Sequence, residues 1–197
     1  MVATCAQPLH RWPTTVTEQT NSAPPQRRLL LLRHAKSAWP DKVEDRERPL
    51  AKRGQEAAPR MGDYLAKNWL HPDLVLVSSA KRTRQTWALV RKALLPAIAD
   101  RFVDEIYEAP ASTLLQVIHT VEPSFETIML VGHNPGMEDL AQELIGEGDE
   151  AGRAAMREKF PTAALAVIDF KVSRWDLVAA GSGRLERFVT PRMLAGE

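Results

Sequence analysis

The chain has 197 residues, of which 44% are hydrophobic and 26% are charged, and its formal net charge at pH 7 is +1. This length and composition are typical of one globular domain with a full core. Cys5 is the only cysteine, which excludes an intramolecular disulfide and a thiolate metal cluster and fits a reducing, cytoplasmic location. The near-neutral charge and the lack of an apolar run near the roughly 20 residues of a membrane span predict no nucleic-acid partner and no membrane partner.

The first 26 residues differ from the rest of the chain. They are rich in Thr, Pro and Gln and show no apolar period, which predicts a disordered N-terminal tail before a single domain over residues 27–197. A transit peptide and a start codon assigned too far upstream are the alternatives. The continuous apolar centre of a secretory signal is absent from this segment.

Three segments share one design, a short apolar run that turns polar at its end. They read LLLLRHAKS (29–37), DLVLVSSAKRTRQT (73–86) and TIMLVGHNPGMEDL (127–140). Such runs are typical of strands that are buried on both faces of a sheet. The second and third continue into helical patterns. Ser78 or Ser79 is expected to cap a helix over about residues 80–95, and Asn134 and Pro135 to begin another.

Two further helices are expected between these segments. One covers about residues 50–70 with Trp69 on its buried face, and Pro59 inside it predicts a kink or a later start. A shorter helix over residues 112–121 would be capped by Ser112.

The last part of the chain predicts two strands near a tight connection, at residues 164–170 and 174–190. They indicate that the sheet ends in an antiparallel edge strand. Strands that alternate with helices predict an α/β fold, with three layers and an open, mostly parallel sheet covered by helices on both faces. Ligands bind such sheets beyond the carboxyl ends of the strands.

Those strand ends carry a cluster of cationic and imidazole side chains, namely Arg33, His34, Arg82 and His133. The planar, permanently charged guanidinium group suits a phosphate or a carboxylate. Arg82 is expected in the first turn of a helix, where free backbone N–H groups add to an anion site. A histidine among arginines can be a nucleophile that accepts a phosphoryl group, or a general acid or base. The set predicts phosphoryl chemistry without a metal cofactor, because the arginines supply the positive charge.

Each of these residues taken singly is also typical of an ordinary surface or helix-capping position. Zinc is the chemical alternative, with His34, His133 and either Glu138 or Asp139 as ligands. The spacings H-x-x-x-H and H-E-x-x-H are absent, however, and the neighbouring arginines would repel a dication.

As an ordered set, LLLLRHAKS, LVLVSSAKRTRQT and IMLVGHNPG resemble the histidine phosphatase superfamily, also called phosphoglycerate mutase-like. Within it, the chain is similar to the small SixA-type phosphohistidine phosphatases over about residues 28–190. The resemblance implies that His34 is the nucleophile that becomes phosphorylated. It also implies that Arg33 and Arg82 bind the phosphoryl group, which His133 contacts.

The same resemblance implies two further site residues and one departure. Arg48, in the sequence DRERPLAKRG, corresponds to an arginine that lines the pocket of SixA-type proteins. Many relatives have an acidic proton donor after the third strand, where VDEIYEAP offers Asp104, Glu105 and Glu108, and Glu105 is the one chosen. Ala35 stands where the commonest motif of the superfamily has glycine, and we expect catalysis to tolerate it.

The function that the resemblance implies is that of a metal-independent phosphatase with a phosphohistidine intermediate and no cofactor. Its expected substrate is phosphohistidine on a protein partner, such as a histidine phosphotransfer domain. Little room exists for a lid domain between His34 and Arg82 or between Leu95 and Ile128, which favours an open pocket and a substrate presented on a protein surface. The alternatives are a phosphatase of small phosphate esters, a mutase, and a non-catalytic module that binds phosphate or phosphohistidine.

Overall fold

Seven strands form one sheet in the computed structural model, which describes residues 26–95 and 97–196. In chain order they are β1 (Arg27–Arg33), β2 (Leu74–Ser78), β3 (Ala99–Val103), β4 (Thr127–Gly132), β5 (Ile145–Gly148), β6 (Leu165–Phe170) and β7 (Gly183–Val189). Across the sheet their order is β3-β2-β4-β1-β6-β7-β5. Apart from Gln26, the predicted N-terminal tail lies outside the described residues.

The predicted α/β fold with a mostly parallel sheet is confirmed, but the antiparallel strand is not at an edge. Strand β6 pairs antiparallel with both β1 and β7, so it lies inside the sheet. The edge beyond it is β5, which pairs parallel with β7. The sequence analysis missed β5 because IGEG carries two glycines and only one apolar residue. It missed β3 because that strand is largely exposed and has no apolar run.

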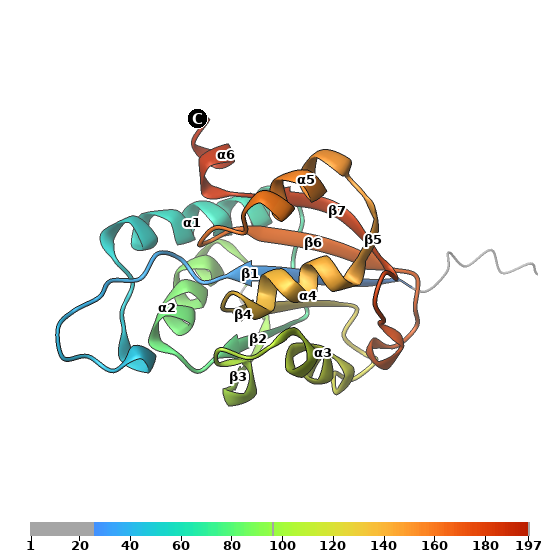
Figure 1. Ribbon diagram of the computed structural model, residues 1–197, viewed down its shortest axis with the longest axis horizontal. Helices are drawn as coiled ribbons and strands as arrows, with labels where there is room; N and C mark the ends of the chain where they lie inside the picture. The colour runs from blue at the N-terminus through green and yellow to red at the C-terminus, as the bar shows by residue number, and fades with distance from the viewer. Residues whose placement is uncertain (1–25, 96, 197) are drawn as a thin grey trace, which may run out of the picture.

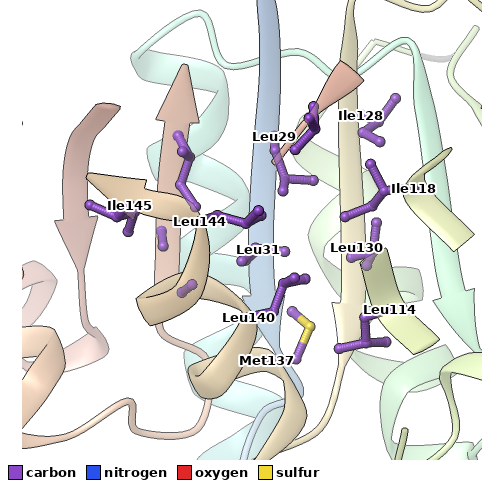
Figure 2. Packing of buried hydrophobic residues seen from close by; sticks show 14 of the residues in the cluster. Leu29, Leu31, Leu114, Ile118, Ile128, Leu130, Met137, Leu140, Leu144 and Ile145 are labelled. Atoms are coloured by element: carbon purple, nitrogen blue, oxygen red, sulfur yellow. The ribbon is translucent and has the colours of Figure 1, made fainter. Parts of the chain in front are cut away.

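Helices cover both faces of the sheet (Figure 1). They are α1 (Lys52–Lys67), α2 (Lys81–Val90), α3 (Ala111–His119), α4 (Gly136–Leu144), α5 (Glu150–Glu158) and α6 (Pro191–Ala195). Alternate residues of β1 point to opposite faces, as the pleat of a strand requires. Leu29 and Leu31 pack with residues of α3 and α4 (Figure 2), whereas Leu30 and Leu32 pack with residues of α1 and α2.

Three of the expected helices, α1, α2 and α3, end earlier than the sequence indicated. Helix α1 begins at Lys52 and runs through Pro59, so the proline does not delay its start. It ends at Lys67, and Trp69, expected on its buried face, is 84% exposed with a φ of 57°. Helix α2 ends at Val90 and gives way to a short 3-10 helix, Arg91–Ala93.

The three N-caps predicted from the sequence are also wrong, since Ala80, Pro110 and Pro135 occupy those positions. Two of the expected capping side chains have other partners. The Ser78 hydroxyl is hydrogen-bonded to His133, and the Asn134 amide donates to the Glu138 carboxylate at 2.7 Å. Polar side chains near the strand ends are therefore engaged with other groups, and α2, α3 and α4 begin without side-chain caps.

The segment at residues 174–190, predicted as one strand, begins with a 3-10 helix, Trp175–Leu177, and only its second half forms β7. The Trp175 ring is fully buried, and its indole N–H donates to the Phe125 carbonyl oxygen at 2.8 Å. Burial of this indole under the sheet explains why the chain turns here, against the strand pattern. Within the described ranges, no helix is both long and apolar enough to cross a bilayer.

Candidate active site

The carboxyl ends of β1, β2 and β4 meet at one edge of the sheet because the three strands are parallel neighbours. Arg33 pairs with Gly132 in the register of β1 and β4, and the His34 N–H donates to the Gly132 carbonyl oxygen at 3.0 Å. The next residue on each strand is a histidine. The ring centroids of His34 and His133 are consequently 5.2 Å apart, so parallel pairing brings together residues that are 99 positions apart.

His34 is held in one tautomer. Its Nδ1 lies 2.8 Å from the Ala35 carbonyl oxygen, which can only accept, so Nδ1 carries the proton and Nε2 keeps its lone pair. Burial lowers the pKa of His34 to about 4, and the charges of Arg82, Arg33 and Arg48 act in the same direction, although the hydrogen bond to Ala35 opposes them. The imidazole is therefore neutral at pH 7, with a free nucleophilic nitrogen.

His133 is buried beside it. The Ser78 hydroxyl lies 2.8 Å from His133 Nε2, and the ring of Tyr107 meets the imidazole edge to face at 5.6 Å between centroids. Burial lowers the pKa of His133 to about 3, assisted by the neighbouring His34 and Arg82. The buried Nδ1 of His133 has no hydrogen-bond partner among the described residues. A donor at this atom is available to a bound oxyanion.

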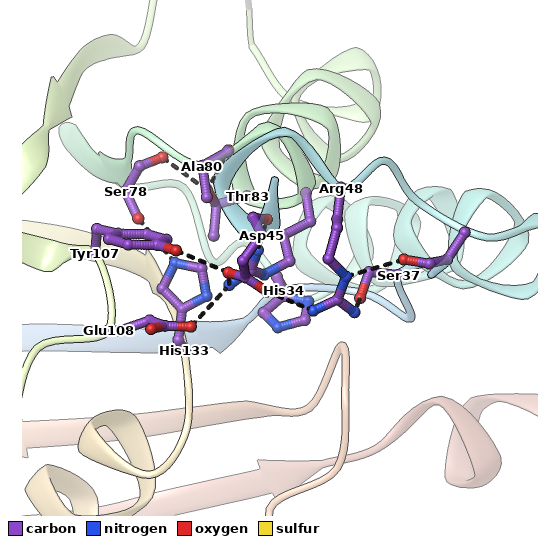
Figure 3. Close-up of polar contacts among 12 residues, drawn as sticks. His34, Ser37, Asp45, Arg48, Ser78, Ala80, Thr83, Tyr107, Glu108 and His133 are labelled. Carbon is purple, nitrogen blue, oxygen red and sulfur yellow. Dashed lines mark hydrogen bonds and ion pairs between the residues drawn. The ribbon is translucent and has the colours of Figure 1, made fainter. Parts of the chain in front are cut away.

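Two buried arginines converge on one carboxylate in the loop before α1. Figure 3 shows one of them, Arg48, beside Asp45 and His34. The Asp45 carboxylate accepts from Arg48 at 2.6 Å and lies 2.9 Å from the guanidinium group of Arg82. It also accepts from the Tyr107 hydroxyl at 2.8 Å. The other Arg48 donors bond the Ser37 hydroxyl and the Ala38 carbonyl oxygen. Both guanidinium groups are thus fixed in place next to His34.

The charge on Asp45 is stable across the physiological pH range. Burial raises its pKa, but the hydrogen bonds from Arg48 and Tyr107 and the charge of Arg82 outweigh burial and hold the pKa well below its ordinary value. Asp45 is therefore an anion at pH 7. It cannot act as a proton donor there, and it stands where the two arginines would otherwise meet the oxygens of a phosphoryl group.

Arg33, at the end of β1, is the third arginine of the site. Its guanidinium group donates to the Phe160 carbonyl oxygen at 2.6 Å, while its buried Nε has no partner among the described residues. Removal from water lowers the pKa of Arg33, and Glu138 opposes this effect. Arginine remains charged at pH 7 in spite of such a shift.

The side chains enclose a pocket of about 280 Å³. Its lining includes five of the six residues proposed from the sequence: Arg33, His34, Arg48, Arg82 and His133. The structure does not bring Glu105, the expected proton donor, to this pocket. Ile106 next to it is buried, which turns the exposed Glu105 into a separate groove beside β3. Glu108 lines the pocket instead, with a carboxylate oxygen 3.4 Å from Arg82.

Sequence reasoning missed three residues of the site, Asp45, Ser78 and Tyr107. Asp45 lies three residues before Arg48, and its pairing with that arginine could have been suggested by the i, i+3 spacing. Ser78 was assigned to helix capping. Tyr107 had no sequence signal, since only the packing of the 3-10 helix Asp104–Ile106 brings the next residue over His133.

The arrangement fits a phosphoryl group better than a metal ion. No three His, Cys, Asp or Glu side chains are grouped for metal binding within residues 26–95 and 97–196. Three guanidinium groups and an imidazole donor surround an unprotonated imidazole nitrogen. This set can hold equatorial oxygens while the nitrogen attacks phosphorus in line.

Comparisons with known proteins agree with this chemistry. A family model described as the histidine phosphatase superfamily (branch 1) matches residues 29–110. An uncharacterized protein of Mycobacterium tuberculosis is 38% identical over 163 residues, which cover 82% of this chain and 100% of that protein.

Two solved structures are also similar. A putative phosphohistidine phosphatase SixA from Agrobacterium tumefaciens shares 36% identity, with a TM-score of 0.71 over 84% of this chain and 98% of that one. A putative phosphohistidine phosphatase SixA from Nakamurella multipartitia shares 27% identity, with a TM-score of 0.74 over 84% of this chain and 96% of that one.

Proposed function

The chain belongs to the histidine phosphatase superfamily, and from that premise we propose that it removes the phosphoryl group from phosphohistidine on a protein partner, through a phosphorylated His34 and without a metal ion. The observation that carries the proposal is the tautomer of His34. Its Nδ1 is bound to the Ala35 carbonyl oxygen, so Nε2 is a free nucleophile at pH 7.

The first chemical step forms the bond between His34 Nε2 and phosphorus and breaks the bond between phosphorus and the imidazole nitrogen of the substrate. The leaving imidazole takes up a proton that Glu108, the acidic side chain that lines the pocket beside Arg82, relays from solvent. Arg33, Arg48 and Arg82 carry the charge of the transferring oxygens. His133, whose Nε2 accepts from the Ser78 hydroxyl, donates from Nδ1 to one of those oxygens.

The second step releases inorganic phosphate. Water attacks the phosphorus of phospho-His34 and gives a proton to the Glu108 carboxylate, and the bond to Nε2 breaks as the neutral imidazole is restored. After the second step, His34 is again a neutral imidazole, ready for another substrate. Neither step needs a dication, because the three guanidinium groups supply the positive charge.

Two observations support phosphohistidine as the substrate. The phosphorus–nitrogen bond has a better leaving group than a sugar ester, so a single exposed acid such as Glu108 is a sufficient proton donor. The similar structure from Agrobacterium tumefaciens is described as a putative phosphohistidine phosphatase. Phosphate esters remain the second substrate class to test.

The test measures phosphate release from a phosphohistidine-bearing peptide in EDTA. We expect turnover by the wild type and a loss of at least about 10³-fold in His34→Ala, because the nucleophile is removed. His119→Ala is the matched control, since this imidazole is hydrogen-bonded to the Val178 carbonyl oxygen and does not line the pocket.

Three results would contradict the proposal. Loss of activity in EDTA would show a metal-dependent mechanism, and equal activity of His34→Ala and the wild type would exclude His34 as the nucleophile. Hydrolysis of a sugar phosphate with kcat/KM of about 10⁴ M⁻¹s⁻¹, without any action on phosphohistidine, would assign the enzyme to small esters.

A further inference from the structure

A second groove, of about 390 Å³, opens beside the catalytic pocket. Its polar lining comes from Lys36, Arg53, Glu56, Arg60, Thr162 and Arg192, and we refer to it as the basic groove. Lys36 and Thr162 also line the catalytic pocket, so the two cavities are adjacent. None of the chemical steps proposed above uses this space.

Helices α1 and α6 form the walls of the basic groove. Arg53, Glu56 and Arg60 lie at spacings of three and four residues and therefore share one face of α1. The short helix α6 packs against α1 and contributes Arg192 from the opposite side. Figure 1 shows α6 at the C-terminal end of the chain, next to α1.

The floor of the groove is fixed to the loop that carries His34. The Ala51 N–H donates to the Lys36 carbonyl oxygen at 2.9 Å. At Gly54, in the first turn of α1, a Cβ atom would lie 2.1 Å from that same oxygen. The helix therefore approaches the loop more closely than any other residue at position 54 would allow, and the groove has a constant position relative to His34.

Several cations without acidic partners in the described part of the chain lie together in the basic groove. Among the described residues, no ion pair involves Lys36, Arg53, Arg60 or Arg192. Most of the exposed arginines that the structure describes elsewhere are paired, as Arg101 is with Glu122, and Arg184 is the exception. Glu56 is the single acidic side chain in the lining, so four positive charges face one negative charge.

We propose that the basic groove binds carboxylate side chains on the segment of the protein substrate that flanks the phosphorylated histidine. This inference rests on the proposed function, which places the phosphoryl group at His34. The proposed reaction places the phosphoryl group in the catalytic pocket, so the larger adjoining groove is available to the rest of a large substrate. Unpaired cations in a groove attract an anionic segment and raise the rate of encounter.

The groove is open to solvent, and its side chains are exposed. Its contribution is therefore moderate and is screened by salt. The selectivity for an acidic substrate should be largest at low ionic strength and should decline as the Debye length falls below the width of the groove.

The experiment compares two phosphohistidine peptides that differ only in their flanks, one with four glutamates and one with four glutamines. Phosphoramidate is the third substrate, because it has no flanking segment that could occupy the basic groove. The groove variant is Arg53→Gln, Arg60→Gln and Arg192→Gln together, with Lys36 unchanged because it also lines the catalytic pocket. The control variant replaces Lys92, Lys171 and Arg184 by Gln, which removes the same charge from surfaces outside both cavities.

At low salt we expect the wild type and the control variant to prefer the glutamate peptide by about tenfold in kcat/KM, and the groove variant to lose that preference. Phosphoramidate hydrolysis should be the same in all three proteins. A groove variant that retains the preference, or a wild type without one, would overturn the inference and leave the proposed function standing.

Two further outcomes are distinguishable. In the first, the wild type prefers a phosphoramidate that carries a second phosphate on a short linker over phosphoramidate itself, but shows no preference between the two peptides. This result would assign the groove to small polyanions and overturn the peptide proposal. Absence of phosphate release from every phosphoramidate substrate would instead overturn the proposed function, and this inference with it.

Discussion

At the scale of single residues, Asp45 is notable because it is an acidic side chain bound to two of the arginines proposed to bind phosphate. Its carboxylate occupies donors of Arg48 and Arg82, the same groups that would hold phosphoryl oxygens. A carboxylate and a phosphoryl oxygen are both acceptors for such donors, so they compete. Asp45 therefore keeps the two arginines ordered between turnovers, and it also limits how tightly the product phosphate binds.

We accordingly predict that Asp45→Asn strengthens inhibition by inorganic phosphate. Removal of the negative charge frees charge-assisted donors on Arg48 and Arg82, and the inhibition constant should fall by about tenfold. Inhibition of phosphoramidate hydrolysis by added phosphate provides the measurement. Asp104→Asn is the control, because Asp104 pairs with Arg46 at the exposed surface. Weaker or unchanged inhibition in Asp45→Asn would mean that Asp45 only orients the arginines.

At the scale of elements, the loop after β1 is held by α1 and α2 together. The Ala35 N–H donates to the Thr86 hydroxyl oxygen of α2 at 3.0 Å. The first turn of α1 contacts the Lys36 carbonyl oxygen through Ala51 and Gly54. A nucleophile must be held accurately for in-line attack, and here two helices hold the loop that carries His34, the proposed nucleophile.

From this contact we predict that Gly54→Ala destabilises the protein and impairs catalysis. The added Cβ would lie 2.1 Å from backbone, so α1 must move away, at a cost of about 2 to 3 kcal/mol in the free energy of unfolding. Urea unfolding measures this cost, and kcat should fall as the loop shifts. Lys52→Ala, in the same turn and exposed, should leave both quantities unchanged. A Gly54→Ala protein as stable as the wild type would show that α1 does not clamp the loop.

At the scale of the whole molecule, the two histidines of the site make the free energy of unfolding depend on pH. His34 and His133 are buried with pKa values of about 4 and about 3, below the ordinary value of 6.5. At pH values between the folded pKa of each histidine and 6.5, the unfolded chain binds a proton on that side chain that the folded chain does not bind. The stabilising effect of the two neutral imidazoles is therefore complete above pH 6.5 and is lost as the pH falls toward 4.

The corresponding prediction is a decrease of about 2 to 4 kcal/mol in the free energy of unfolding between pH 7 and pH 5 from these two groups. Urea unfolding at both pH values measures it. The double variant His34→Asn and His133→Asn should show a smaller decrease, because neither side chain can take up a proton. An equal decrease in both proteins would attribute the pH dependence to other groups.

The sequence by itself determined most of the site. Apolar runs such as Leu29–Leu32 are typical of strands that are buried on both faces, and the polar residues that follow such strands lie at the carboxyl edge of the sheet. On this basis the sequence predicts that Arg33, His34, Arg82 and His133 lie together, and the structure brings them to one pocket. Arg48 came from the family resemblance.

Only the tertiary structure decided the remaining features, because each depends on contacts between segments far apart in the chain. Pairing with β1 and β7 places β6 inside the sheet, and burial of Ile106 turns Glu105 away while Glu108 faces Arg82. Asp45 meets Arg82, and α6 meets α1, through packing that no local pattern encodes. Periodicity in a sequence reports which residues are buried locally, whereas the partner of a polar side chain is set by the global arrangement of elements.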